Sequence, residues 1–324
     1  AGLAKTQYGC LPMAPHTAWE WLERYGSIQL DEGQKEMEFE ELRETVTRDV
    51  EKMEAFLQME PLLKATKKMA KTAADVVQEG SSFGALRAKE RAINQERPLS
   101  EHLSFSVRET EKIWQDYLET GILREPDPQE VPPAFVNSEK MFQMIQKTAG
   151  ENGGWYAHYQ LGILLMQKKA YEEAGRELEA SICAAEQPWA CHGLAALLVL
   201  EGREEEAARM MEKGILLRKD DLGYVKEGFQ ILLTCQAYEI LKGIYEELED
   251  GLKENGRLKF GYIRSLFQMG ETERAEELLE EGGGLIVEDI REGESGLGAI
   301  WRELQNAKGI KDAPVPYRFD FESI

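Results

Sequence analysis

Cysteine and histidine are the residues of this chain best suited to metal binding or redox chemistry, and their spacing argues against both. The four cysteines form no Cys-x-x-Cys pair, and the four histidines form no His-x-x-His or His-x-x-x-His pair. A zinc site needs several such ligands brought together. We therefore expect no metal and no cofactor, and we expect reduced, mostly buried thiols in an intracellular protein. The residues concerned are Cys10, Cys183, Cys191, Cys235, His16, His102, His158 and His192.

Phosphate-binding and hydrolytic chemistry are weakly supported as well. Residues 293–298 are rich in glycine, but they lack the order Gly-x-Gly-x-x-Gly, a preceding strong strand and a lysine. Carboxylates are so abundant that a glycosidase-like pair cannot be singled out. No Ser, His and Asp can be nominated as a catalytic set from their spacing. We predict no catalytic residue in this chain.

Charge narrows the choice of partners. Acidic residues outnumber basic ones 60 to 39, which gives a formal net charge of −21. Such a surface repels phosphate backbones and anionic lipids unless basic residues are segregated, and no dense Lys/Arg cluster is present. No run of eighteen apolar residues occurs. We expect neither nucleic acid nor membrane as a partner, and we predict a cytoplasmic location.

The elements that would position any site begin with an atypical segment, residues 1–30. Pro12 and Pro15 exclude a helix there, and Trp19, Trp21 and Tyr25 crowd large aromatic groups into a short stretch. Such residues must be buried against something. We interpret residues 1–30 as the last strand or two of an upstream β-domain.

Residues 31–135 are predicted to be helical at first and then a linker. Apolar residues recur every three or four positions from Phe39 to Leu57, and Pro61 should end or kink that helix. A second helical face should continue to Gly80. The spacing suits an intramolecular helical hairpin or bundle better than a coiled coil, which remains the alternative. Residues 80–100 are predicted to form turns, 106–119 a helix, and the prolines from 126 to 133 a linker.

A period of about 34 residues follows. Four aligned segments place Ala174, Ala207, Leu241 and Ala275 in equivalent positions, separated by 33, 34 and 34 residues. Each unit reads as a helix–turn–helix pair that buries its apolar faces only by stacking on its neighbours. The pattern resembles the tetratricopeptide repeat. We predict an all-α fold with a tetratricopeptide-type helical array of about four units.

In this repeat family the first helix of each unit lines a concave surface. Carrying its positions over gives an aromatic end and a basic end, which is typical of an interface. The alternative is that the chain's own residues 31–135 already fill the groove. The predicted binding residues are Tyr156, Tyr159, Trp189, His192, Lys226, Gln230, Arg257, Phe260 and Arg264.

A wider resemblance rests on three stretches: AGLAKTQYGCLPMAPHTAWEWLERYG, the repeat block, and IVEDIREGESGLGAIWRELQ with VPYRFDF. Together they are similar to the C-terminal half of large bacterial proteins with an N-terminal aldose-epimerase-like β-sandwich of unassigned function. The resemblance implies that a parent protein acts on or binds carbohydrate. It also implies that the sugar site lies mostly upstream, with Gln7 the one residue here placed near it.

These observations predict four regions: a β-sandwich remnant (1–30), a helical hairpin or bundle with a linker (31–135), the repeat array (136–281) and a capping segment (282–324), with Trp301 as its anchor. Two functions compete. One is a non-catalytic scaffold that contacts its own upstream β-domain or another protein segment. The other is part of the substrate site of a carbohydrate-active enzyme, with Tyr159 and Trp189 stacked on sugar rings. Fold class alone does not decide between them.

Overall fold

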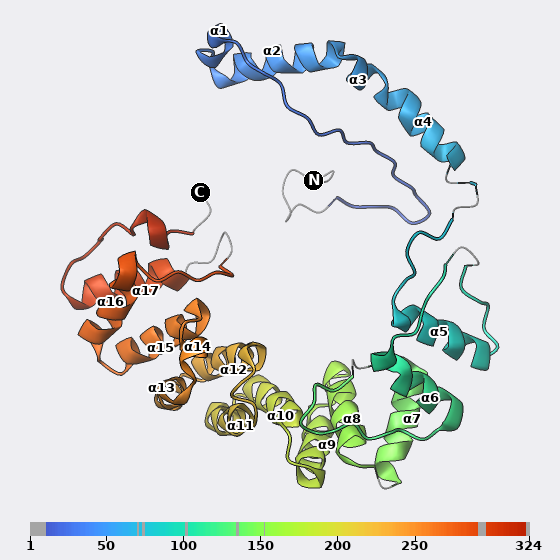
Figure 1. The fold of residues 1–324 in the computed structure, drawn as a ribbon, viewed down its shortest axis with the longest axis vertical. Coiled ribbons are helices and arrows are strands. Elements are labelled where there is room, and N and C mark those ends of the chain that lie inside the picture. Colours follow the sequence, from blue (N-terminus) through green and yellow to red (C-terminus); the bar gives the residue numbers. More distant parts are fainter. Residues whose placement is uncertain are drawn as a thin grey trace. The chain divides into compact units, whose positions relative to one another are not determined.

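The computed structural model describes residues 11–69, 71–72, 75–100, 103–133, 136–151, 153–290 and 296–321. Predictions for Gln7, Cys10, His102 and residues 291–294 lie outside these ranges. The chain divides into two compact units (Figure 1). Unit 1 comprises residues 1–79 with 100–104, and unit 2 comprises residues 80–99 with 105–324. The region boundaries predicted from the sequence stay predictions.

Unit 1 contains four helices that follow one another along the chain: α1 (Glu32–Lys35), α2 (Phe39–Lys52), α3 (Glu54–Leu57) and α4 (Met59–Met69). The predicted helix from Phe39 exists, but it breaks at Met53, whose ψ of 136° is extended. Pro61 does not end a helix, as the sequence led us to expect. It lies in the first turn of α4, where its missing N–H has no intrahelical partner to lose.

Residues of unit 1 remain exposed. No residue of α1, α2 or α4 is buried, and the main contacts of α2 and α3 are with the next helix along the chain. The predicted antiparallel hairpin is therefore not what these helices form. Residues 11–30 contain no helix or strand, and Trp19 and Trp21 are 41% and 51% exposed.

Unit 2 begins with helices that precede the repeats. They are α5 (Ser82–Ile93), η1 (Glu109–Glu111), α6 (Lys112–Thr120) and α7 (Glu139–Gly150). The prediction of turns over residues 80–100 is wrong, because α5 occupies most of that range. The predicted end of a helix at Gly121 is confirmed, since this glycine takes a left-handed conformation and closes α6. Ser138 caps α7 by accepting a hydrogen bond from the Met141 N–H.

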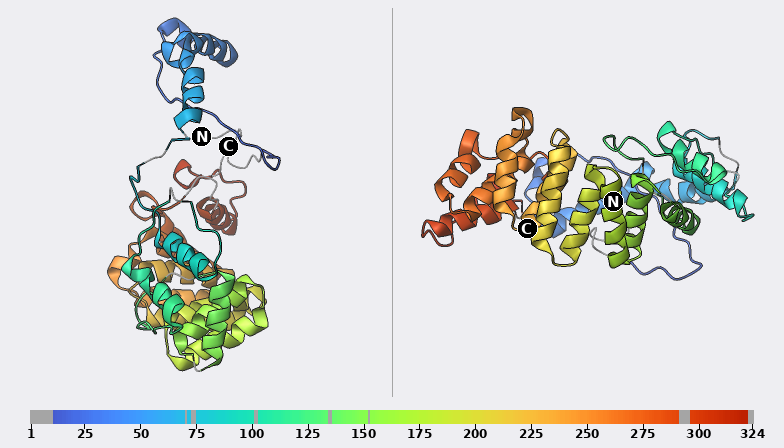
Figure 2. Two further views of the ribbon diagram at one scale, coloured as in Figure 1. Left: turned by 90° about the vertical axis from the view of Figure 1, so that its right-hand side faces the viewer. Right: turned by 90° about the horizontal axis from the view of Figure 1, so that it is seen from below.

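The repeats are four helix pairs (Figure 2): α8 (Trp155–Gln167) with α9 (Tyr171–Ala184), α10 (Pro188–Leu200) with α11 (Glu204–Leu217), α12 (Leu222–Thr234) with α13 (Tyr238–Glu247), and α15 (Gly256–Gln268) with α16 (Thr272–Glu280). A one-turn helix, α14 (Asp250–Lys253), lies between the third and fourth pairs. Three-residue turns join the two helices of each pair. The predicted all-α tetratricopeptide-type array is confirmed.

Small residues explain why the pairs pack so closely. Ala174, Ala207 and Ala275 are fully buried, as predicted. A Cβ atom on Gly162 would lie 2.7 Å from Cγ of Leu178, so α8 and α9 approach closely only because that side chain is absent. In Figure 1 the first helices, α8, α10, α12 and α15, lie on the inner side of the curve that the repeats of unit 2 follow.

The C-terminal segment covers the last repeat. Helix α17 (Gly296–Ala307) packs on α15 and α16, and the chain then passes η3 (Tyr317–Phe319). Leu297, Ile300, Leu304 and Phe319 are buried in this cap. Trp301 is half-buried and donates its indole N–H to the Pro314 carbonyl, so the predicted anchor is at the edge of the cap. None of the helices over the described residues is both long and apolar enough to cross a membrane.

Candidate binding surface

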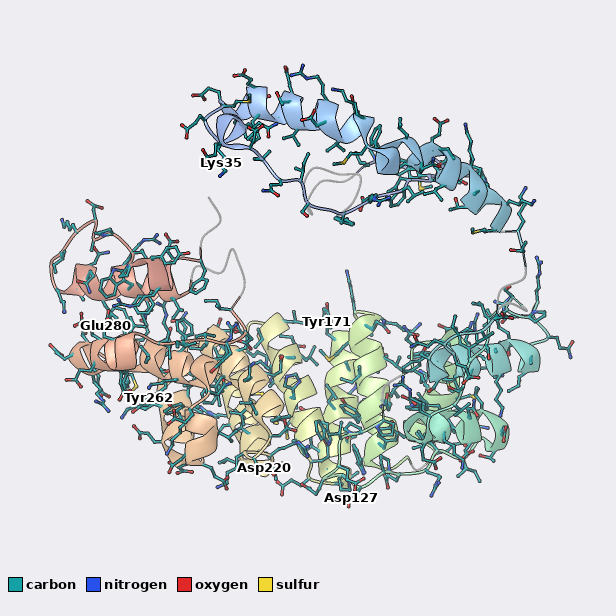
Figure 3. All side chains as sticks on the ribbon, turned by 45° about the horizontal axis from the view of Figure 1, so that its top comes forward. Lys35, Asp127, Tyr171, Asp220, Tyr262 and Glu280 are labelled. Atoms are coloured by element: carbon teal, nitrogen blue, oxygen red, sulfur yellow. The ribbon has the colours of Figure 1, made fainter. Side chains whose placement is uncertain are left out.

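A segment without helix or strand, residues 122–133, runs from α6 towards α7 and lies along one edge of the array; it contains one turn, in which the Glu130 N–H donates to the Asp127 carbonyl. We call this segment the strap. We call the first turns of α8, α10, α12 and α15 the rim. Figure 3 places Asp127 of the strap and Asp220, from the turn before α12, at one edge of the array and Tyr171, at the start of α9, at the other. The proline-rich linker predicted from the sequence is thus held against the repeats.

Hydrogen bonds fix the strap to the first two repeats and to the turn that leads into the third. The indole N–H groups of Trp155 and Trp189 donate to the carbonyls of Pro126 and Pro128 at 3.3 and 3.2 Å. The Tyr156 hydroxyl donates to the Pro133 carbonyl, and Arg218 Nη1 donates to the Gln129 carbonyl at 2.8 Å. Four side chains that the repeats supply therefore bind four strap carbonyls; these carbonyls belong to Pro126, Pro128, Gln129 and Pro133.

Glu125 supplies a further contact at the start of α8. Its carboxylate accepts the Tyr156 backbone N–H at 3.3 Å, where the positive end of the helix dipole favours an anion. A Cβ on Gly154 would lie 1.8 Å from Glu125 Oε1, so the glycine leaves room for the carboxylate. The strap thus caps α8 as well as binding the aromatic side chains.

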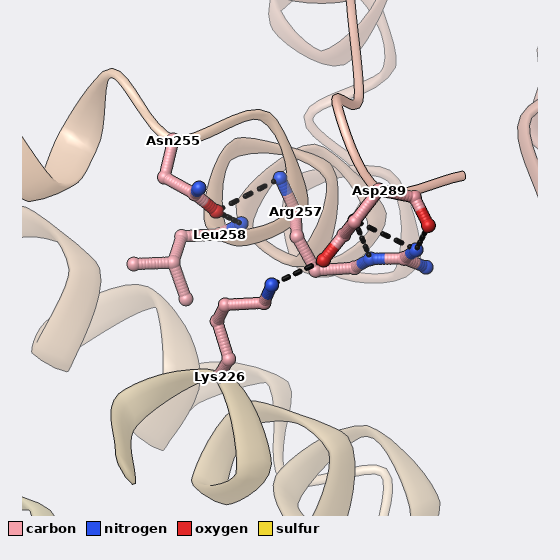
Figure 4. Close-up of polar contacts among 5 residues, drawn as sticks. All are labelled: Lys226, Asn255, Arg257, Leu258 and Asp289. Carbon is pink, nitrogen blue, oxygen red and sulfur yellow. Dashed lines mark hydrogen bonds and ion pairs between the residues drawn. The ribbon is translucent and has the colours of Figure 1, made fainter. Parts of the chain in front are cut away.

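A second segment, residues 285–290, covers the other end of the rim, and we call it the latch. Asp289 forms ion pairs with Lys226 from α12 and with Arg257 from α15, the latter at 2.8 Å (Figure 4). Hydrogen bonds from Lys226 and Arg257 lower the pKa of the Asp289 carboxyl. Asn255 caps α15 by accepting from the Arg257 and Leu258 N–H groups (Figure 4). A Cβ on Gly256 would lie 1.9 Å from the Ile286 carbonyl oxygen, so α15 needs glycine there.

The structure therefore distributes the nine predicted binding residues over four settings. Tyr156 and Trp189 contact the strap, and Lys226 and Arg257 contact the latch. Arg264 forms an ion pair with Glu303 of α17 at 2.8 Å, and Phe260 packs within the C-terminal cap. The remaining three are Tyr159, His192 and Gln230.

These three residues, with Ile163 and Ala196, form what we call the inner face, on α8, α10 and α12. Gln230 is exposed and the other four are half-buried. Burial lowers the pKa of His192, while Glu227 opposes this more weakly, and burial raises the pKa of Tyr159 to about 12. Near neutral pH the inner face is therefore an uncharged mixture of aromatic, aliphatic and amide groups.

Trp189 is enclosed by its own chain. The Arg218 guanidinium lies over its ring at 4.8 Å from the centroid, and Tyr224 meets it edge-on at 5.8 Å. Arg218 is itself held by Asp221, the residue that caps α12. The indole therefore positions the strap and has little free ring surface.

One motif typical of a catalytic serine was not predicted from the sequence. Residues 80–84 fit Gly-x-Ser-x-Gly, with Ser82 at the nucleophile position and Gly80 in an isolated β-bridge with Phe105. Ser82 is only 3% exposed, and its hydroxyl oxygen accepts the Arg108 backbone N–H at 3.0 Å. Its oxygen thus has a structural role in joining the start of α5 to the segment before α6.

The remaining candidate ligands stay apart. The structure describes three cysteines, and all three are free. Cys191 is buried, Cys235 is half-buried and Cys183 is exposed, so the prediction of mostly buried thiols is only partly confirmed. Burial raises the pKa of the Cys191 thiol to about 11, which disfavours the reactive thiolate. Within the described ranges, no three His, Cys, Asp or Glu side chains are grouped as a metal site requires.

Comparisons with known proteins add little to this description. No family model matches the chain, and a search of curated proteins finds no match. The chain is similar to the crystal structure of a TPR-domain containing protein from Parabacteroides distasonis ATCC 8503, with 16% identity and a TM-score of 0.46. The similarity covers 70% of this chain and 40% of that one, so the chain spans less than half the length of the matched structure. The resemblance to proteins with an aldose-epimerase-like domain stays a prediction.

Proposed function

We propose that the repeat array is a non-catalytic interaction module that binds a protein segment on the inner face. The observation that carries this proposal is the division of the first-helix surface. The strap contacts one end of the rim, the latch and the C-terminal cap contact the other, and the contacts of neither segment described above reach the inner face. The chain thus leaves a bounded, mostly apolar surface across three repeats.

The chemistry of the inner face suits a protein partner. Tyr159 offers a large contact area at a small cost in side-chain entropy, and Gln230 can pair with a backbone amide. Ala196 is half-buried and has the smallest side chain of the inner face. A segment bound there would be specified by shape and a few hydrogen bonds, because the basic groups Lys226, Arg257 and Arg264 already pair with acids of this chain.

The source of that segment is a finer part of the proposal. An upstream β-domain of a carbohydrate-related protein, as the sequence resemblance implies, would be tethered and so present at high effective concentration. A direct role in sugar binding is less well supported, because Arg218 and Tyr224 occupy the surroundings of the Trp189 ring. We therefore favour the scaffold over the alternative of an enzyme's substrate site.

Selection from a phage-displayed library of random linear peptides on the intact chain tests the proposal. We expect enriched peptides whose affinity, measured by calorimetry, falls about thirtyfold or more in Ala196→Arg. This substitution places a long charged side chain in the middle of the inner face, where it can still reach solvent. The matched control is Glu205→Ala, at an exposed position of the outer helix α11, which should leave affinity unchanged.

A second variant guards against misfolding. Tyr159→Ala should weaken the same peptides while the circular-dichroism spectrum of the array is retained. Enriched peptides that bind the wild type, Ala196→Arg and Tyr159→Ala equally well would show that the inner face is not the binding surface.

A further inference from the structure

The strap is held mainly through its backbone. Four of its contacts run from array side-chain donors to strap carbonyls, and the donors are Trp155, Tyr156, Trp189 and Arg218. Indole and phenol donors that bind carbonyls of a proline-rich segment are also used in polyproline recognition. The strap differs in containing a turn, in which the Glu130 N–H donates to the Asp127 carbonyl at 3.1 Å. Contacts to backbone carbonyls place little demand on the side chains of the bound segment.

The strap contributes little burial of its own. None of residues 122–133 is buried, and Ile122 and Val131 are 70% and 66% exposed. A surface hollow of about 660 Å³ separates part of the strap from α6, lined by Lys112, Ile113 and Asp116 on the α6 side. Segments with few buried contacts and exposed hydrogen bonds open at low free-energy cost. By contrast, the Trp155 and Tyr156 side chains at the rim are 3% and 0% exposed.

The composition of the strap defines what the rim accepts. Four of its residues are proline, three are acidic and one is basic: Pro126, Pro128, Pro132 and Pro133; Glu125, Asp127 and Glu130; and Arg124. Proline fixes the backbone angle φ, so less conformational entropy is lost on binding. The Glu125 carboxylate lies at the N-terminus of α8, where negative charge is favoured.

We propose that the starts of α8 and α10, together with Arg218 in the turn before α12, form a binding site for acidic, proline-rich segments that contain a turn like that of residues 127–130, and that the strap is its displaceable internal ligand. A competing segment of another protein places its carbonyls on the same four donors and an acidic side chain at the start of α8. This site is separate from the inner face, and it does not depend on the function proposed above.

A fluorescent peptide with the sequence of residues 122–133 is the probe, titrated with the intact chain and followed by anisotropy. The tethered strap competes at an effective concentration of about millimolar, so the wild type should bind the peptide weakly. The variant Glu125→Ala/Gln129→Ala weakens the strap and leaves every array donor in place. We expect it to bind the probe at least about tenfold more tightly than the wild type.

Two further measurements identify the contacts. Trp189→Phe, added to the strap-weakened variant, keeps a ring but removes one donor, and it should lower probe affinity about two- to tenfold. A probe with its prolines replaced by alanine should bind more weakly by a similar factor, because its free backbone is less restricted and Pro128 no longer favours the turn. Ala196→Arg should leave probe binding unchanged, which separates this site from the inner face.

The proposal is overturned if the strap-weakened variant, shown to be folded by circular dichroism, gives no saturable binding. It is also overturned if the proline-free probe binds as tightly as the original, or if Trp189→Phe has no effect. The last two results would indicate nonspecific association with exposed aromatic groups.

Discussion

Helices α2 of unit 1 and α9 of the array are alike in sequence and opposite in burial. Both have 14 residues, and both begin with an aromatic residue followed by two glutamates. Helix α9 buries Ala174, Leu178 and Ser181, whereas α2 buries no residue and its Phe39 is 72% exposed. Amphipathic spacing is therefore enough to form the helix and not enough to provide its partner.

Small residues account for the difference. Helix α9 contains Ala174 and faces Gly162 of α8, so two backbones can approach and Leu178 can fill the space between them. The apolar residues of α2 are all large, and the segment that precedes it is extended. Close packing needs complementary shapes on both sides, and the repeats provide them at every 33rd or 34th residue.

The difference in packing between the two units can be tested by truncating one leucine in each, and this pair should give the largest difference in the free energy of unfolding. Leu178→Ala removes a fully buried side chain and should lower the free energy of unfolding by about 2–5 kcal/mol. Leu62→Ala in α4, where the side chain is 49% exposed, should change it by less than about 0.5 kcal/mol. Urea unfolding followed by circular dichroism measures both, and similar values would mean that unit 1 is better packed than the structure shows.

Enlarging an alanine should give a smaller but still clear difference. Ala207→Trp overpacks the fully buried contact between paired helices and should cost about 1–3 kcal/mol. Ala65→Trp, at an exposed position of α4, is the matched change and should be nearly neutral. Thermal melting of the two variants provides the measurement, and a neutral Ala207→Trp would contradict close packing at the repeat interface.

Acidification should lower the stability of the array through His192. Burial depresses the pKa of His192 in the folded state, so below its ordinary value of about 6.5 the unfolded chain binds more protons. This contribution to stability is therefore full above about pH 6.5 and is lost as pH falls towards the folded-state pKa. Urea midpoints between about pH 7 and pH 5 should decline less in His192→Gln than in the wild type. Parallel declines would exclude His192 as the cause.

Removing residues 1–79 should have the smallest effect on the array. Helices α1, α2 and α4 bury no residue, and these residues belong to unit 1. We expect the helical signal to fall in proportion to the helices deleted, while the melting transition of the repeats shifts by no more than about 1–2 °C. A marked loss of cooperativity on deletion would show that unit 1 stabilises the repeats.

The sequence predicted what depends on local pattern. Ala174, Ala207 and Ala275 marked the repeat, because a fixed period of small residues has few other physical meanings. Gly121 marked the end of α6, since glycine readily adopts the left-handed conformation of a helix C-cap.

Features that depend on distant contacts were missed. Helix α5 lies in the range predicted to form turns, and a Cβ on its Gly84 would lie 2.1 Å from the Phe105 ring that packs on the helix. The prolines of the strap excluded a helix but gave no sign of the donors they meet. Trp155 and Trp189 lie 29 and 61 residues from their carbonyl partners, a separation that a local pattern does not encode.

The path of the strap across the rim has a mechanical consequence. Its carbonyls are bound by residues at the starts of α8 and α10 and by Arg218 in the turn before α12, so it ties one edge of the neighbouring repeats together. Bending that spreads this edge must stretch or break those hydrogen bonds, whereas the opposite edge carries no such tie among the contacts described for the strap. The array therefore resists bending more strongly at the edge that the strap ties than at the opposite edge. Detaching the strap would soften it and allow the curvature around the inner face to change.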